Sequence, residues 1–168
     1  GNVILFRRNI ESRSQLERLC RSLRELILAE TGAEPLIAID QEGGVVTRLS
    51  DDMINTPGAM ALAAAGGDAA YRAGLITASE LRSAGVNFNL APDLDVNSNP
   101  NNPVIGVRSF GDEPGRSSAA ALEFMRGTLE GGVMACGKHF PGHGDTAVDS
   151  HLGLPRVEKS REELEAQE

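Results

Sequence analysis

Side chains able to do chemistry are concentrated between Lys138 and His151, in the string KHFPGHGDTAVDSH. This window holds all three histidines of the chain, together with Asp145 and Asp149. Imidazole is the side chain that exchanges protons near neutral pH, so the cluster favours acid–base chemistry over core packing. In Asp149-Ser150-His151 a carboxylate can hold one ring nitrogen while the other gives or takes a proton. The alternative is a solvated loop that gathers these residue types by chance.

Two further acidic groups come directly after apolar runs. Asp40-Gln41-Glu42-Gly43-Gly44 follows the run 36–39, where a carboxylate beside two glycines suits hydrogen bonding to a polar ligand. The alternative there is a helix cap and a tight turn. Asp93 and Asp95 follow the run 86–91, either as loop caps or as support for a site. Arg48 lies in the loop after the run 36–39, and Arg108 in the loop after the run 86–91. Each is either a ligand contact or an ordinary surface or ion-pair arginine.

Apolar runs alternate with helical stripes along the chain. The sequence predicts strands over residues 3–6, 36–39, 86–91 and 133–136. The predicted helices between and after them begin at a capping box of Ser14 and Glu17, at Asp68, at Ser117 or Ser118, and at a second capping box of Ser160 and Glu163. Apolar strands joined by helices are typical of an α/β fold with a parallel sheet. Every long polar loop follows a strand, on the face where such sheets carry their sites.

The composition is that of an acidic globular protein. The 168 residues include 24 acidic and 16 basic side chains, for a net charge of -8. An acidic chain without a Lys/Arg cluster argues against nucleic acid and anionic membranes as partners. No apolar run approaches the ~18 residues of a membrane span. Zinc-type Cys/His spacing, GxGxxG and Walker motifs are absent, so we predict no cofactor and no metal; Cys20 and Cys136 are expected to be buried, reduced thiols.

Four segments resemble, in order, glycoside hydrolase family 3. They are Ile39–Gly44, Ala91–Asp95, Arg108–Phe110 and Lys138–His151. Within that family, KHFPGHGDT…DSH is similar to the β-N-acetylglucosaminidase branch. The resemblance implies a TIM (β/α)8 barrel, of which this α/β chain would supply about strands 2 to 5 with their helices.

The resemblance also implies an activity and residue roles. The activity is retaining hydrolysis of terminal β-linked N-acetylglucosamine, typically from peptidoglycan fragments during cell-wall recycling. His151 would be the general acid/base and Asp149 its partner, since an imidazole with a pKa of ~6.5 can protonate the leaving oxygen and then activate water. The residues expected to hydrogen-bond the sugar are Asp40, Arg48, Arg108, Lys138 and His139. Non-proline cis peptide bonds are expected at Ser109–Phe110 and Lys138–His139.

Departures from the family pattern predict a fragment. No stretch matches the SDD-type motif of the family's aspartate nucleophile, whose place would lie well beyond position 168, and the family's first strand is missing. Residues 1–168 are therefore expected to be a partial barrel domain, truncated at both ends and inactive alone. The alternatives are a non-catalytic sugar-binding remnant or a metal-dependent hydrolase using His139, His143 and His151. Unpaired cysteines and the recycling role favour the cytoplasm, and the oligomeric state stays open.

Overall fold

Four short parallel strands form one sheet in the computed structural model, which describes residues 1–147, 153–157 and 159–167. The strands are β1 (Val3–Leu5), β2 (Ile37–Ile39), β3 (Phe88–Asn89) and β4 (Met134–Ala135). Each strand pairs with the one before it in the sequence, in the order β1-β2-β3-β4. The register aligns one residue from each strand across the sheet: Leu5, Ile39, Asn89 and Ala135. The predicted parallel α/β sheet is confirmed.

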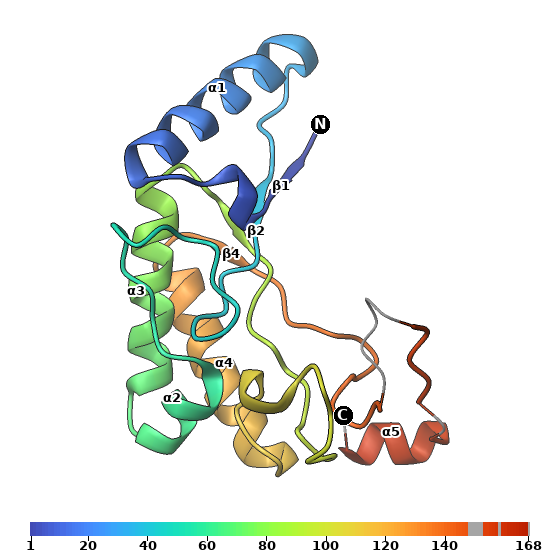
Figure 1. Ribbon diagram of the computed structural model, residues 1–168. Helices are drawn as coiled ribbons and strands as arrows, with labels where there is room; N and C mark the ends of the chain where they lie inside the picture. The colour runs from blue at the N-terminus through green and yellow to red at the C-terminus, as the bar shows by residue number, and fades with distance from the viewer. Residues whose placement is uncertain (148–152, 158, 168) are drawn as a thin grey trace.

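Helices connect the strands, as parallel pairing requires. They are α1 (Arg13–Thr31), α2 (Ala59–Ala65), α3 (Ala69–Ser83), α4 (Pro114–Glu130) and α5 (Arg161–Gln167), with the 3-10 turns η1 (Arg7–Asn9) and η2 (Gly106–Arg108). Figure 1 shows α3 and α4 side by side, with α5 on the far side of the loops that follow the strands. Within the described ranges, none of these helices is long and apolar enough to cross a membrane.

Two predicted helix starts are wrong by a few residues, each because of a different cap. Helix α1 is capped by Ser12 rather than Ser14, since the Ser12 side chain accepts a hydrogen bond from the Gln15 backbone N–H. Helix α4 begins at Pro114 rather than at Ser117 or Ser118. The Glu113 carboxylate accepts from two backbone N–H groups there, and proline suits the first turn because it has no N–H to satisfy.

Of two other helices, α5 begins at the predicted capping box, whereas α2 was not predicted. The capping box at Ser160 and Glu163 is confirmed, because each residue's side chain accepts from the other's backbone N–H. Helix α2 lies before Asp68, in a stretch where no helix start was predicted. Its alanine-rich sequence has high helix propensity, and it begins after Gly58 and ends at Gly66, whose φ is +67°.

The core has two parts. One lies between the sheet and helices α1 and α3; the other lies among α2, α3 and α4. Cys20 belongs to the first part, and burial raises the pKa of its thiol to about 11. The predicted buried, reduced thiol is therefore confirmed at Cys20, whereas Cys136, also reduced, is only partly buried.

Candidate active site

The loops that follow β2, β3 and β4 meet at the carboxyl ends of these strands. Asn89 of β3 fastens the loop after β2, because its side chain both accepts from the Gln41 backbone N–H and donates to the Gln41 carbonyl. The loop after β4 runs beside the loop after β3, where the Leu94 backbone N–H donates to the Lys138 carbonyl at 2.6 Å. Polar side chains distant in the sequence are thereby brought to one edge of the sheet.

A glycine turn sets the position of the acidic residues after β2. Gly43 and Gly44 have φ values of +94° and +57°, which L side chains rarely adopt. A Cβ at Gly43 would also lie 2.6 Å from the Pro57 carbonyl oxygen. The tight turn foreseen as an alternative for this motif is therefore present, and it presents Asp40 and Glu42 to the other two loops.

Glu42 joins two cations that come from different loops. Its carboxylate accepts from Arg108 Nε and Nη2, both at 2.9 Å, and lies 2.6 Å from Lys138 Nζ. Lys138 Nζ also donates to Asp40 Oδ1 at 2.7 Å. Glu42 is only 7% exposed, so these contacts form in a medium where charge pairing is strong. Burial alone would lower the pKa of Arg108, but the pairing with Glu42 raises it above its ordinary value.

Asp95, in the loop after β3, holds His139, which follows Lys138 in the loop after β4. Its Oδ2 lies 2.6 Å from His139 Nδ1, and its Oδ1 accepts from the His143 backbone N–H at 2.6 Å. Burial opposes ionisation of Asp95, yet these hydrogen bonds outweigh it and hold its pKa below the ordinary value. On its other side His139 Nε2 lies 3.5 Å from Arg108 Nη2, which links Asp95 to the Glu42 group.

Asp93, two residues earlier, has the opposite electrostatic setting. It is buried, and its Oδ2 lies 3.5 Å from Arg108 Nη2 without accepting a hydrogen bond from any described group. Burial, followed by the negative charge of Asp95, raises the pKa of Asp93 to about 9, and Arg108 offsets this only partly. The surroundings therefore favour the protonated form of Asp93 and the ionised form of Asp95.

Asn102 clamps the first part of the histidine-bearing loop. Its buried side-chain amide donates to the backbone carbonyls of His143, Gly144 and Thr146. Its Oδ1 accepts from the backbone N–H groups of Val104 and Ile105. The segment that leads toward position 148 is thus held against the loop after β3.

The structure brings together four of the five predicted sugar contacts: Asp40, Arg108, Lys138 and His139. Arg48 forms no ion pair within the described part of the chain, and its Nε is buried without a hydrogen-bond partner there. Its backbone N–H donates to Gln41 Oε1 at 2.8 Å. The predicted catalytic pair, Asp149 and His151, lies outside the described residues.

One of the two predicted non-proline cis peptide bonds is present. Lys138–His139 is cis, as are Ala91–Pro92 and Phe140–Pro141. The expectation of a cis bond at Ser109–Phe110 is wrong. The Ser109–Phe110 bond is trans, Ser109 is extended, and its hydroxyl oxygen lies 2.6 Å from the Asp95 carbonyl oxygen and 2.8 Å from the Gly111 carbonyl oxygen.

Two residues of this cluster were not predicted as site residues, Glu42 and Asn102, whereas Asp95 was predicted either as a loop cap or as support for a site. The sequence carried a signal for Glu42, which stands in the same glycine motif as Asp40, and for Asp95, which lies in the loop after the apolar run 86–91. Their partners are 41 to 96 positions away along the chain, so nothing in the local pattern showed the pairing. Asn102 stands in an Asn/Pro-rich loop in which several asparagines were equivalent candidates.

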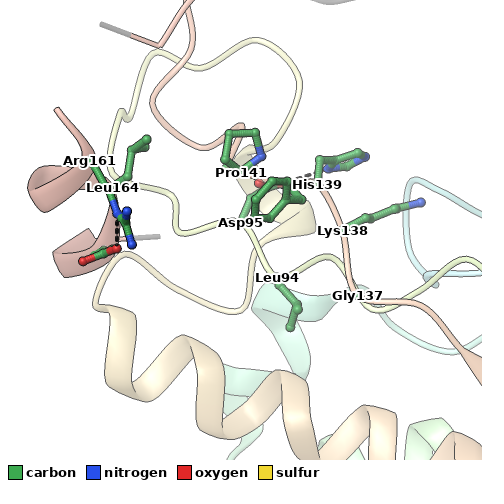
Figure 2. A pocket seen from close by; sticks show the side chains of 11 residues that line it. Leu94, Asp95, Gly137, Lys138, His139, Pro141, Arg161 and Leu164 are labelled. Atoms are coloured by element: carbon green, nitrogen blue, oxygen red, sulfur yellow. Dashed lines mark hydrogen bonds and ion pairs between the residues drawn. The ribbon is translucent and has the colours of Figure 1, made fainter. Parts of the chain in front are cut away.

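Two cavities flank the charged cluster. The larger, of about 570 Å³, is lined by Asp95, Lys138, His139 and apolar residues of the same loops, and by Arg161 and Leu164 of α5. Figure 2 shows the Asp95 carboxylate joined to the His139 ring at one wall, with Lys138 pointing away from α5. The other, of about 350 Å³, is lined by Glu42, Arg108, the glycine turn and α2.

The structure describes two of the three histidines that were considered as metal ligands, His139 and His143. His139 and His143 have ring centroids 5.8 Å apart, and each Nδ1 is already engaged, by Asp95 and Thr146 respectively. Among the described residues, the group with ligand atoms close enough to share a metal ion is Asp93, Asp95 and His139, all within 4.8 Å. Asp95 and His139 already pair with each other, and Arg108 Nη2 lies 3.5 Å from both Asp93 Oδ2 and His139 Nε2.

A parallel sheet with a charged site at the carboxyl ends of its strands is the arrangement found in barrel enzymes. The sequence pattern described as "Glycosyl hydrolase family 3 N terminal domain" matches residues 1–168. The chain therefore belongs to glycosyl hydrolase family 3, a family of glycosidases, and forms part of its TIM-barrel-type domain.

Relatives and solved structures agree with this assignment. The chain is 41% identical to Beta-hexosaminidase A of Pseudoalteromonas piscicida over its whole length, covering 29% of that protein. It is 42% identical to a Beta-hexosaminidase of Methylococcus capsulatus, covering 50% of it. A family 3 β-N-acetylglucosaminidase from Paenibacillus sp. superposes on 99% of the chain with a TM-score of 0.94 and 49% identity, and the match covers 32% of that structure. The chain thus spans half or less of the length of these proteins.

Proposed function

We propose that this chain provides the sugar-binding and acid/base part of a retaining glycosidase that removes terminal β-linked N-acetylglucosamine. The observation that carries the proposal is the convergence of Asp40, Arg108, Lys138 and His139 at one edge of the sheet. Relatives at about 40% identity are named β-hexosaminidases, and NagZ from Neisseria gonorrhoeae, of similar fold, was solved with N-trifluoroacetyl-D-glucosamine. We further propose that the sugar comes from peptidoglycan fragments and that the protein acts in the cytoplasm.

Each binding residue offers the chemistry that a sugar requires. Asp40 accepts hydrogen bonds from hydroxyl groups, while Lys138 and Arg108 donate to hydroxyl or acetamido oxygens. Glu42 holds both cations in place before the sugar arrives, so little ordering is needed on binding. His139 is the most exposed of these side chains and faces the larger cavity.

In the proposed mechanism His151 acts as general acid and then as general base, with Asp149 as its partner. The imidazole donates a proton to the leaving oxygen as the glycosidic bond breaks, and it later takes a proton from the attacking water. A carboxylate nucleophile forms the covalent glycosyl intermediate between the two steps. We place that nucleophile outside residues 1–168, because this sequence has no match to the family's SDD-type motif.

The first test is binding without turnover. Titration of the 168-residue chain with N-acetylglucosamine should show saturable binding that perturbs the NMR signals of Lys138 and His139. Glucose, which lacks the acetamido group, is the matched control ligand and should bind more weakly. The same chain should not release 4-nitrophenol from its N-acetyl-β-glucosaminide. Absence of saturable binding would refute the sugar site, and enzyme-like turnover would refute the external nucleophile.

The second test places His151 in a complete enzyme. A chimera can carry residues 1–168 in place of the matched segment of the Methylococcus capsulatus β-hexosaminidase. We expect it to hydrolyse the chromogenic substrate, and we expect His151→Ala to reduce kcat by about 100-fold or more, the range of general acid–base catalysis. Asp145→Asn, a change at an exposed residue of the same loop, is the control and should retain activity. Equal activity of the His151→Ala and Asp145→Asn chimeras would exclude the acid/base role.

A further inference from the structure

Asp95 occupies a position from which it can control the protonation of a neighbouring ring. It is 2% exposed, and each carboxylate oxygen faces a different nitrogen at 2.6 Å: His139 Nδ1 for Oδ2, and the His143 backbone N–H for Oδ1. An ionised carboxylate has no proton to give, so it is only an acceptor in both contacts. His139 Nδ1 must therefore carry the hydrogen of that contact.

The opposite side of the His139 ring leads to the same tautomer. Nε2 lies 3.5 Å from Arg108 Nη2, and a guanidinium group can only donate. A hydrogen on Nε2 would point toward this cation, whereas a lone pair on Nε2 is compatible with it. Asp95 and Arg108, which come from different parts of the loop after β3, thus both favour the tautomer of His139 with its proton on Nδ1 over the one with its proton on Nε2.

We propose that Asp95 is a positioning residue that holds His139 in the Nδ1–H tautomer, so that Nε2 accepts a hydrogen bond from a hydroxyl group of the sugar. This inference rests on the proposed function for the sugar contact of His139, but the tautomer itself does not. In this assignment His139 Nε2 is a hydrogen-bond acceptor, whereas Lys138 and Arg108 can only donate hydrogen bonds. The site then distinguishes a hydroxyl that donates from a group that only accepts.

The Asp95→Asn variant tests this assignment because asparagine has one acceptor oxygen instead of two. The backbone N–H of His143 cannot change its polarity, whereas the imidazole can move its proton. We expect the asparagine oxygen to accept from His143 and its amide to donate to His139 Nδ1. The ring should then shift to the Nε2–H tautomer, at the same heavy-atom geometry.

The first readout is the tautomer, measured by imidazole 15N chemical shifts at mildly alkaline pH, where a histidine with an ordinary pKa is neutral. The chain has only three histidines, so the signals can be assigned by single substitutions. The wild-type protein should show His139 protonated on Nδ1, and Asp95→Asn should show it on Nε2. Asp93→Asn, the same change at a buried aspartate two residues away, should leave the tautomer unchanged.

The second readout is binding of N-acetylglucosamine, which Asp95→Asn should weaken by about 10-fold, the loss of roughly one hydrogen bond. If the wild-type ring carries its proton on Nε2, or on both nitrogens, the inference is wrong even when the sugar binds. If the ring is Nδ1–H but the wild-type chain binds no sugar, the proposed function fails and the role of Asp95 in setting the tautomer stands. Should Asp95→Asn not fold, the wild-type spectrum alone decides the assignment.

Discussion

At the scale of single residues, Glu42 balances the charges of Arg108 and Lys138 at a buried position. Replacing it with glutamine keeps the shape but removes the charge, and buried cations left without a partner are strongly destabilising. We expect Glu42→Gln to lower the free energy of unfolding by about 3 kcal/mol, the lower end of the range for broken buried pairs, because Asp40 still pairs with Lys138. Urea unfolding followed by circular dichroism measures this.

The exposed pair of Arg24 and Glu34 supplies the matched control. Its guanidinium and carboxylate also form two hydrogen bonds, at 2.7 and 2.9 Å, but both side chains are in contact with solvent. Solvent-exposed pairs contribute little because water screens them. Glu34→Gln should therefore leave the unfolding midpoint almost unchanged. Equal midpoints for Glu34→Gln and Glu42→Gln would show that the Glu42 contacts do not stabilise the fold.

Asp93 makes a separate prediction about pH. Burial raises its pKa in the folded protein to about 9, so the folded state binds a proton that the unfolded state releases above about pH 4. The free energy of unfolding should therefore fall as the pH rises from about 4 to about 9, by up to about 1.4 kcal/mol per pH unit. Asp93→Asn cannot titrate, so its stability advantage over wild type should grow between about pH 5 and about pH 8. Parallel stability curves across this range would contradict the assignment.

The types and places of these residues could be read from the sequence, but their partners could not. Asp40 and Lys138 each follow an apolar strand, and parallel strands end at one edge of a sheet, which made their proximity predictable. Arg48 follows the same strand as Asp40, yet it forms no ion pair with the cluster among the described residues. Which side chains meet within the cluster depends on loop conformations that no periodicity encodes.

At the scale of elements, two glycines allow α3 and α4 to pack closely. A Cβ on Gly74 would lie 2.1 Å from the Phe124 carbonyl oxygen, and a Cβ on Gly127 would lie 2.1 Å from the Tyr71 carbonyl oxygen. Alanine ordinarily stabilises a helix by up to about 1 kcal/mol relative to glycine. At Gly127 the sign should reverse, because the helices must move apart, and overpacking of this kind costs about 1–3 kcal/mol.

Thermal unfolding of Gly127→Ala checks this prediction against a second glycine of the same helix. Gly115 lies in the first turn of α4, where an added methyl group would meet only the flexible Glu113 side chain, at 3.3 Å. We expect Gly115→Ala to leave the melting temperature unchanged or raise it, and Gly127→Ala to lower it. A rise in both variants would mean that the two helices are not in close contact. Neither role was visible in the sequence, where both positions are simply glycines within helical stretches.

At the scale of the whole molecule, the described sheet has two unpaired edges, β1 and β4. Each carries an exposed apolar side chain, Ile4 at 51% and Met134 at 43% exposure. Open edges of this kind pair with other chains, and a lysine on the edge opposes such pairing. We expect the 168-residue chain to self-associate as its concentration rises, and Met134→Lys to reduce this in sedimentation velocity experiments.

Leu122→Lys is the control for this experiment, because Leu122 is similarly exposed, at 56%, but lies on α4 away from the strand edges. Both variants remove one apolar surface residue and add one positive charge. Only Met134→Lys should shift the association to higher concentration. If the two behave alike, general surface hydrophobicity rather than the strand edge drives the association.

The sequential order of the strands has a consequence for synthesis on the ribosome. Each strand pairs with the one made just before it, so the sheet can grow as the chain emerges, without waiting for a later strand. The charged cluster cannot form in this way, because Asp40 and its partner Lys138 are 98 positions apart. At translation rates of about 5–20 residues per second, that gap corresponds to roughly 5–20 s. Asp40 and Glu42 therefore emerge well before either of their cations, and a nascent chain carries the scaffold of this site before it carries the site.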